Sequence, residues 1–192
     1  MKLVVGLGNP GDSRKTDRHN VGFLLLEMFC QDRGVELREN QKYKALVGSD
    51  AVGIRYLKPL TYMNLSGFSV KGLSEYYKIP PKLILVLHDE LDLSVGEVRL
   101  KRGGGTGGHN GLRSIEQSLS SKDYCRIRLG IGRPPNGKQS VTSHVLNSPT
   151  ADEATAIKAG MEKILEHADD LLSGSFDRAM NSLNQSNNIK DL

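Results

Sequence analysis

Leu83-Ile84-Leu85-Val86-Leu87 is the stretch of this sequence that decides the fold class, because all of its positions are apolar. It follows Pro80-Pro81, which prevents the preceding helical pattern from continuing. So short and uniform an apolar run is typical of a strand buried on both faces, as in the middle of a largely parallel sheet. The stretch therefore predicts such a sheet, with this strand inside it.

Segments with strand patterns and helix patterns intermix on either side of this stretch. Short apolar runs predict strands, and apolar positions spaced three and four residues apart predict helices. The other expected strands are Lys2–Leu7, Tyr43–Val47, Val52–Leu57, Val98–Lys101 and Cys125–Ile131. The expected helices are Val21–Arg33, Ser66–Tyr77, about Leu112–Leu119, Thr150 to about Leu172 with a capping box at Thr150-x-x-Glu153, and Asp177–Leu183. The mixture predicts an α/β fold.

Length and composition indicate one globular domain. A chain of 192 residues, 38% hydrophobic and 25% charged, is long enough for one core and short for two. We expect a single domain over residues 1–185 and a disordered tail over 186–192. The sequence has no apolar run of membrane-helix length and no signal-peptide pattern, and Cys30 and Cys125 stand in apolar contexts. These features predict a cytoplasmic protein that does not bind membranes.

Positive charge is concentrated in one part of the chain. The net charge is +4 overall, but Met1–Thr150 holds 22 bases and 14 acids, a net charge of +8. Between Arg99 and Lys138, nine bases stand against two acids. Such a block favours a polyanionic partner, while a solvated basic surface is the alternative.

The first glycine-rich motif, Gly6-Leu7-Gly8-Asn9-Pro10-Gly11, fits the G-x-G-x-x-G pattern of dinucleotide-binding proteins. In that class the helix begins inside the motif, whereas here a polar segment continues to Val21. We therefore expect a tight turn that presents Asn9 at the carboxyl edge of the sheet. A dinucleotide-binding oxidoreductase remains an alternative function.

The second motif, Gly103-Gly104-Gly105-Thr106-Gly107-Gly108-His109-Asn110-Gly111, lacks the Gly-Lys-Ser/Thr ending of a nucleoside-triphosphate loop. Glycines allow the backbone to approach a bulky ligand closely, at an entropic cost that favours a functional role over a structural one. His109 and Asn110 then offer polar groups at the start of the next helix. This loop is a candidate part of a binding site.

Histidines are the best candidates for proton transfer near neutral pH. His19 and His109 are each followed by asparagine and lie beside turns, so both are active-site candidates, and the pattern alone does not separate them. His88 stands beside Asp89, Glu90 and Asp92, but without a metal-ligand spacing, and we expect no metal. No Gly-x-Ser-x-Gly nucleophile motif is present. These residues favour direct attack by water.

Several motifs, taken in order, resemble the bacterial-type peptidyl-tRNA hydrolases over about the first three quarters of the chain. They are Val4–Gly11 (VVGLGNPG), Arg18–Gly22 (RHNVG), Leu57–Gly67 (LKPLTYMNLSG), His88–Leu93 (HDELDL), Gly103–Arg113 and Arg126–Gly132 (RIRLGIG). The resemblance implies a monomer with a mixed, mostly parallel, twisted sheet packed between helices. It also implies a cofactor-free enzyme that cleaves the ester between a peptide and tRNA, recycling tRNA in translation.

The resemblance assigns roles to individual residues. His19 matches the family's general base, Asp89 matches the carboxylate that orients it, and Asn9 matches the residue that distinguishes a peptide from a free amino acid. The residues that match contacts to the tRNA end are Tyr62, Met63, Asn64, His109 and Asn110. The residues expected to contact tRNA phosphates are Lys101, Arg102, Arg126 and Arg128.

The segment before His19 departs from the family pattern. The usual Tyr-x-x-Thr-Arg-His-Asn is replaced by Arg14-Lys15-Thr16-Asp17-Arg18-His19-Asn20. Arg14 would contact a phosphate in place of the tyrosine ring, and Asp17 near His19 would raise the pKa of the histidine. A related RNA-binding protein that has lost hydrolysis is therefore a second alternative.

Overall fold

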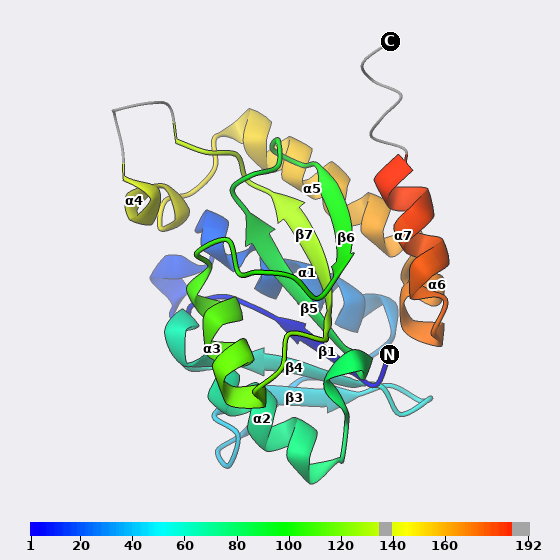
Figure 1. The fold of residues 1–192 in the computed structure, drawn as a ribbon. Helices are drawn as coiled ribbons and strands as arrows, with labels where there is room; N and C mark the ends of the chain where they lie inside the picture. The colour runs from blue at the N-terminus through cyan, green and yellow to red at the C-terminus, as the bar shows by residue number, and fades with distance from the viewer. Residues whose placement is uncertain (135–139, 186–192) are drawn as a thin grey trace.

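Strand β5 (Ile84–Glu90) lies inside a seven-stranded sheet, as its apolar sequence predicts (Figure 1). The structure, a computed structural model, describes residues 1–134 and 140–185. The strand order is β2-β3-β4-β1-β5-β7-β6. The other strands are β1 (Leu3–Gly6), β2 (Arg38–Asn40), β3 (Ala45–Ser49), β4 (Arg55–Pro59), β6 (Val98–Arg102) and β7 (Cys125–Gly130).

The middle of the sheet is parallel and its edges are antiparallel. Strands β4, β1, β5 and β7 run in one direction, with Val5 paired to Leu57 on one side and to Val86 on the other. Strands β2, β3 and β6 join antiparallel. The predicted fold class, a mixed and mostly parallel sheet in an α/β domain, is confirmed.

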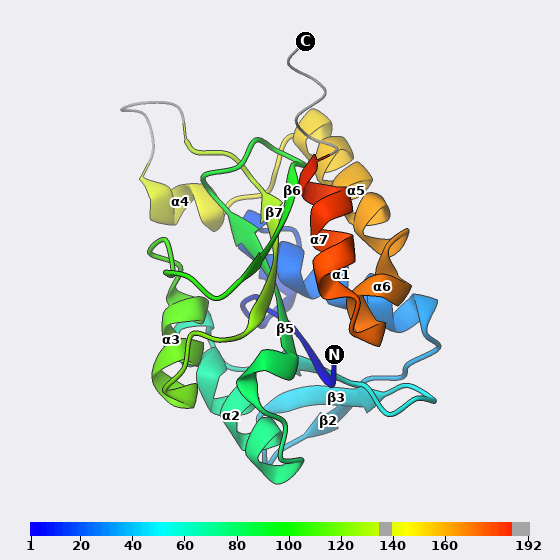
Figure 2. The ribbon, with the colours of Figure 1, turned by 45° about the vertical axis from the view of Figure 1, so that its right-hand side comes forward.

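Helices cover both faces of the sheet (Figure 2). Helices α2 (Ser66–Tyr76) and α3 (Asn110–Leu119) lie on one face, and α1 (Val21–Asp32), α5 (Ala151–Leu165), α6 (Ala168–Ser173) and α7 (Phe176–Gln185) lie on the other. Successive strand residues point to opposite faces. Accordingly, Val5 and Val86 pack with the first group, and Val4 and Leu85 with the second.

Three details differ from the sequence predictions. The expected helix from Thr150 to Leu172 begins with the predicted capping box, but it is interrupted between α5 and α6, which lets Leu171 and Leu172 turn into the core. Strand β2 is short and polar, so its sequence lacks the alternation of apolar and polar residues from which a strand is predicted. Helix α4 (Val141–Val145) lies in a segment for which the sequence predicted no helix. Residues 135–139 and the expected tail 186–192 lie outside the described residues.

A close contact at Gly22 sets the position of α1 over the sheet. A Cβ atom at Gly22 would overlap the backbone carbonyl oxygens of Leu7, directly after β1, and of Leu87, in the middle of β5. The start of α1 can therefore lie directly on the backbone of these two neighbouring segments. His19, three residues earlier, is thereby held beside the end of β5.

Replacing Gly22 with alanine should destabilise the protein, because backbone must move to admit one methyl group. Overpacking of this kind typically lowers the free energy of unfolding by about 1–3 kcal/mol. Urea unfolding should show a lower midpoint for Gly22→Ala than for Gly105→Ala, where an added Cβ meets no atom within 4 Å. Equal midpoints for the two variants would contradict this packing argument.

None of the helices in residues 1–134 and 140–185 combines the length and apolar character needed to cross a membrane.

Candidate active site

A cavity of about 410 Å³ opens at the carboxyl ends of β1, β4 and β5. Ligands of open α/β sheets bind at this edge. The cavity is bounded by the segment after β1, the segment after β4, the end of β5, the second glycine-rich loop and α4. Its lining residues are Asn9, His19, Tyr62, Met63, Asn64, Asp89, Glu90, Leu91, Thr106, Gly107, Gly108, His109, Asn110, Arg133, Val141, Thr142, Val145 and Leu146.

His19 and Asp89 form a buried pair in the wall of this cavity. His19 lies in the 3-10 turn Arg18–Asn20, immediately before α1, and Asp89 lies near the end of β5. The Nδ1 atom of His19 is 2.9 Å from each carboxylate oxygen of Asp89. When Nδ1–H donates to Asp89, the tautomer is fixed and Nε2 carries the lone pair. Nε2 is then the atom that can accept a proton.

His109 also donates to Asp89, but both of its ring nitrogens are occupied. Its Nε2 lies 3.0 Å from Oδ1 of Asp89, and its Nδ1 accepts from the backbone N–H of Gly111 at 3.1 Å, which caps α3. By contrast, Nε2 of His19 has no hydrogen-bond partner among the residues that the structure describes. The geometry thus separates two histidines that the sequence pattern left equivalent. His109 holds Asp89 in place, and His19 is available for proton transfer.

The shared carboxylate sets the ionisation of the pair. Burial would raise the pKa of Asp89, but His19 and His109 outweigh burial and hold it well below the usual range. Burial would lower the pKa of His19, but the charge and hydrogen bond of Asp89 outweigh it and raise the pKa, with a smaller contribution from the buried Asp17. Asp17 therefore acts in the direction expected from the sequence, toward a higher pKa of His19.

The raised pKa of His19 predicts an acid limb that Asp17 helps to set. Below that pKa the imidazole is protonated and cannot act as a base, so activity should fall as the pH falls through it. Asp17→Asn removes one negative charge near His19, lowers the pKa of His19, and should shift the acid limb of kcat/KM to lower pH. Asp12→Asn, on the same segment but exposed, is the control. An acid limb that is unchanged in Asp17→Asn would contradict the argument.

The cluster of His19, Asp89 and His109 also contains the kinds of side chain that bind metal ions. In the described part of the chain, His19, Asp89 and His109 are the group whose ligand atoms, all within 4.8 Å of one another, could hold an ion. The spacings of 2.9 and 3.0 Å are those of N–H···O hydrogen bonds, in which the histidine nitrogens facing Asp89 carry protons. His88, the residue that first suggested a metal, donates from Nδ1 to the carbonyl oxygen of Asp89 at 2.7 Å.

Asn9 is held rigidly beside this pair. Its backbone N–H donates to Oδ1 of Asn20 at 2.7 Å, and its carbonyl oxygen accepts from Nδ2 of Asn20 at 2.9 Å. Its own Oδ1 accepts from the backbone N–H of Met63 at 2.9 Å. This leaves the Nδ2 amide of Asn9 to donate to a ligand in the cavity. Asn20 is thus a supporting residue to which the sequence analysis gave no role.

Arg18 anchors the turn that carries His19, a role that the sequence analysis also missed. Its guanidinium lies 2.6 Å from Glu153 on α5 and 3.1 Å from the carbonyl oxygen of Asn147. No spacing rule could have paired residues 18 and 153, because the contact depends on how α5 packs beside α1.

The remaining predicted cavity residues separate into wall and mouth. Met63 is buried in the wall, and Tyr62, Asn64 and Asn110 are exposed at the cavity. Arg14 does not line the cavity, and its guanidinium instead lies 3.4 Å from Asp17.

The predicted basic residues differ in accessibility. Lys101 is exposed, Arg102 pairs with Asp177, and the half-buried Arg128 pairs with Glu90 at 2.9 Å. Arg126 departs from the expectation of a phosphate contact, because it is only 2% exposed. Its guanidinium donates to the carbonyl oxygens of Gly103 and Gly105, the latter at 2.9 Å. Arg126 therefore stabilises the backbone of the glycine-rich loop through these hydrogen bonds.

The first glycine motif also differs from a dinucleotide site. After β1 the chain forms two 3-10 turns, Asp12–Arg14 and Arg18–Asn20, before α1 begins at Val21. The helix N-terminus that would meet a pyrophosphate is therefore not inside the motif. The structure does not support the oxidoreductase alternative.

A histidine oriented by a buried carboxylate, with its free nitrogen in a cavity that also holds amide groups, defines a site for base-assisted attack of water. Among the described residues that line the cavity there is no serine or cysteine to serve as nucleophile. The fold and the site therefore define the class of a hydrolase built on a mixed α/β sheet.

The chain belongs to the peptidyl-tRNA hydrolase family, whose profile matches residues 3–191. It is 46% identical over 185 residues to a peptidyl-tRNA hydrolase from Halorhodospira halophila, with 95% of each chain covered. It is 45% identical over 183 residues to one from Coxiella burnetii, covering 95% of this chain and 97% of the relative. Among solved structures, peptidyl-tRNA hydrolase from Acinetobacter baumannii matches with a TM-score of 0.91 and 40% identity, over 96% of this chain and 94% of the other. The resemblance seen in the sequence is thereby confirmed.

Proposed function

We propose that this protein hydrolyses the ester bond between a peptide and tRNA, with His19 as the general base. The observation that carries the proposal is the hydrogen bonding of His19, because Nδ1 is fixed by Asp89 while Nε2 is left to act in the cavity. Family membership supports the same substrate class.

The reaction follows from this geometry. Nε2 of His19 removes a proton from water as the water oxygen bonds to the ester carbonyl carbon. The tetrahedral intermediate then collapses with cleavage of the bond to the ribose oxygen, and the proton passes from His19 to that oxygen. The products are a peptide with a free carboxyl group and a tRNA with a free hydroxyl group. Amide donors such as that of Asn64 would stabilise the oxyanion, and one such donor contributes about 10²–10³-fold.

Asn9 gives the site its preference for peptides. Its Nδ2 amide would donate to the peptide carbonyl next to the ester. A free aminoacyl group has no such carbonyl, and it brings an ammonium group that would have to lose its hydration. Oδ1 of Asn9 already accepts a hydrogen bond from the backbone N–H of Met63. Rotating the amide so that Oδ1 faced the ligand would break this hydrogen bond, so the side chain is held with Nδ2 toward the cavity.

The tRNA would be held in two places, at the mouth of the cavity and on basic side chains outside it. Tyr62, Met63, Asn64, His109 and Asn110 would contact the esterified end, since RNA ends are held by stacking and by contacts to base edges. Lys101, Arg128 and Arg14 would contact phosphates, and Arg126 would act through the glycine-rich loop. We further propose that the protein acts as a monomer in the cytoplasm.

Hydrolysis of an N-acetyl-aminoacyl-tRNA tests this function, with the unblocked aminoacyl-tRNA as control and a chelator in parallel. We expect hydrolysis of the blocked substrate alone, unaffected by the chelator. Binding of the RNA without turnover would instead identify an RNA-binding relative. Loss of turnover with the chelator would show that catalysis requires a metal ion, which His19, Asp89 and His109 could bind.

A further inference from the structure

Exposed hydrophobic side chains are concentrated on one segment of the molecule. Of the eight large hydrophobic residues exposed in the described part of the chain, five come from the segment Tyr62–Tyr77. They are Tyr62, Leu65, Phe68, Tyr76 and Tyr77, and we call them the α2 strip. Such a concentration of exposed apolar side chains on one segment indicates a candidate interaction site.

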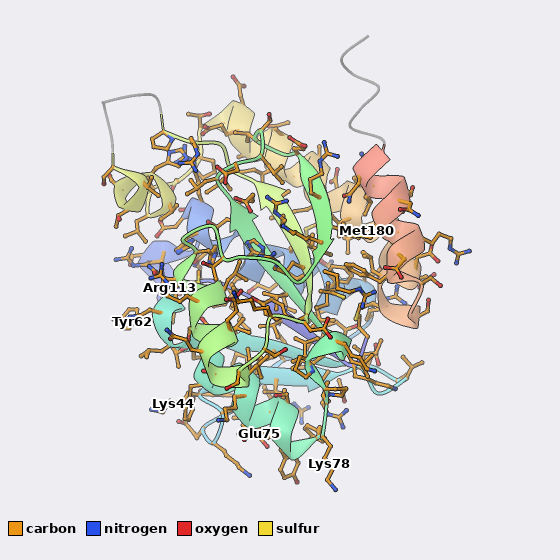
Figure 3. The ribbon with its side chains drawn as sticks, in the orientation of Figure 1. Lys44, Tyr62, Glu75, Lys78, Arg113 and Met180 are labelled. Atoms are coloured by element: carbon orange, nitrogen blue, oxygen red, sulfur yellow. The ribbon has the colours of Figure 1, made fainter. Side chains whose placement is uncertain are left out.

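The strip follows the length of α2 and the turn before it, from Tyr62 to Tyr77 at the C-cap of α2. Val70 and Leu73 face the sheet and are fully buried, whereas Phe68 is 51% exposed and Tyr76 is 61% exposed. Figure 3 shows Tyr62, Lys44, Glu75 and Lys78 along one margin of the molecule, from the active-site side to the far end of α2. The strip is therefore an extended surface.

Positive charges lie against its rings. Nζ of Lys44 is 5.4 Å from the ring centre of Phe68, and Nζ of Lys42 is 4.7 Å from that of Tyr76. The guanidinium of Arg55 lies 3.4 Å from the ring centre of Tyr77.

Local packing holds these cations in position. The turn 41–44 packs on α2, where the absence of a side chain at Gly72 leaves room for the ring of Tyr43. The hydroxyl group of Ser69 also donates to the carbonyl oxygen of Lys44.

The charge balance identifies the chemistry of the partner. Residues 41–44, 55 and 62–78 contain five cations and one acid, Glu75. Exposed rings beside lysine and arginine are the tools of single-stranded nucleic-acid binding, since a ring stacks on a base while a neighbouring cation contacts a phosphate. An acidic protein partner could form ion pairs with the cations, but its side chains would not stack on the rings as nucleic-acid bases do.

The strip is continuous with the cavity. Tyr62 belongs to the strip and lines the cavity mouth, and Asn64, two residues later, also lines it. We infer that the α2 strip binds unpaired nucleotides of the RNA whose esterified end occupies the cavity. This inference rests on the proposed function, and it extends the RNA contacts along α2, away from the basic residues of β6 and β7.

The test compares two substrates with the same acyl group, an N-acetyl-aminoacyl-tRNA and the corresponding ester of adenosine alone. Phe68→Ala and Tyr76→Ala should each raise KM for the tRNA substrate by roughly fivefold or more, as expected for loss of one stacked base. Turnover of the adenosine ester should be unchanged. Lys44→Ala should also reduce the salt dependence of KM, by a slope of roughly one.

Val52→Ala and Lys158→Ala are the matched controls, because both residues are exposed and neither belongs to the α2 strip or lines the cavity. Unchanged KM for the tRNA substrate in Phe68→Ala and Tyr76→Ala would overturn the inference, and would point to a protein partner. Equal losses with both substrates would also overturn it, by showing an effect on the cavity itself. If the wild-type protein hydrolyses neither substrate, the proposed function fails, and binding of the same tRNA to His19→Ala and its strip variants still decides the role of the strip.

Discussion

Replacing His19 with alanine should lower kcat by roughly 10²–10⁴-fold, the contribution typical of a positioned general base. Nε2 of His19 is the atom proposed to take the proton from water, and His109 cannot substitute because both of its nitrogens are engaged. The affinity for N-acetyl-aminoacyl-tRNA should change little, since His19 is buried and would meet only the reacting end of the substrate. Single-turnover hydrolysis and a direct binding assay measure the two quantities separately.

His167→Ala provides the matched control for this substitution. His167 lies between α5 and α6 and does not line the cavity, and its ring hydrogen-bonds to the carbonyl oxygen of Lys163 and to the hydroxyl group of Ser182. It should retain wild-type kcat. Unchanged turnover in His19→Ala, with the control also unchanged, would remove His19 from the mechanism. A large loss of RNA affinity in His19→Ala would show that it binds the substrate.

Asp89→Asn should have the second large effect, again roughly 10²–10⁴-fold in kcat, the range of a misplaced general base. The amide nitrogen of asparagine would take the place of one carboxylate oxygen, 2.9 Å from Nδ1 of His19. Two donors would then face each other, which favours the tautomer with its proton on Nε2. That tautomer has no lone pair directed at water. Loss of the negative charge also lowers the pKa of His19, so the remaining activity should extend to lower pH.

The measurement is a pH profile of kcat/KM together with thermal unfolding. A reduced rate with a shifted acid limb and a cooperative unfolding transition supports an orienting role. If Asp89→Asn lost activity only in proportion to unfolded protein, Asp89 would be a structural residue. Asp152→Asn, an exposed acid at the start of α5 that does not line the cavity, is the control.

Much of the fold could be predicted because its signals are local. The uniform apolar sequence of β5 and the capping box at Thr150 each depend on a few adjacent residues, and both are present as expected. Strand β2 could not be found this way, because an exposed polar strand at the sheet edge carries no hydrophobic pattern. The interruption after α5 was missed because apolar spacing continues across it.

The candidate site required tertiary information. His19 and His109 are alike in sequence, and they differ only in whether a second ring nitrogen is occupied. Arg126 and Lys101 count equally as charges, yet one is buried under a loop and the other is exposed. Charge counts identify a basic region, but burial decides which of its members can reach a phosphate.

The anchoring of Arg18 by Glu153 has a consequence for the synthesis of the protein. The turn that carries His19 is tied to a helix that is translated more than a hundred residues later, and Asp89 and His109 lie in between. A growing chain therefore has no partner for Arg18 until α5 has been synthesised, and the segment of the active site that is translated first gains its anchor last.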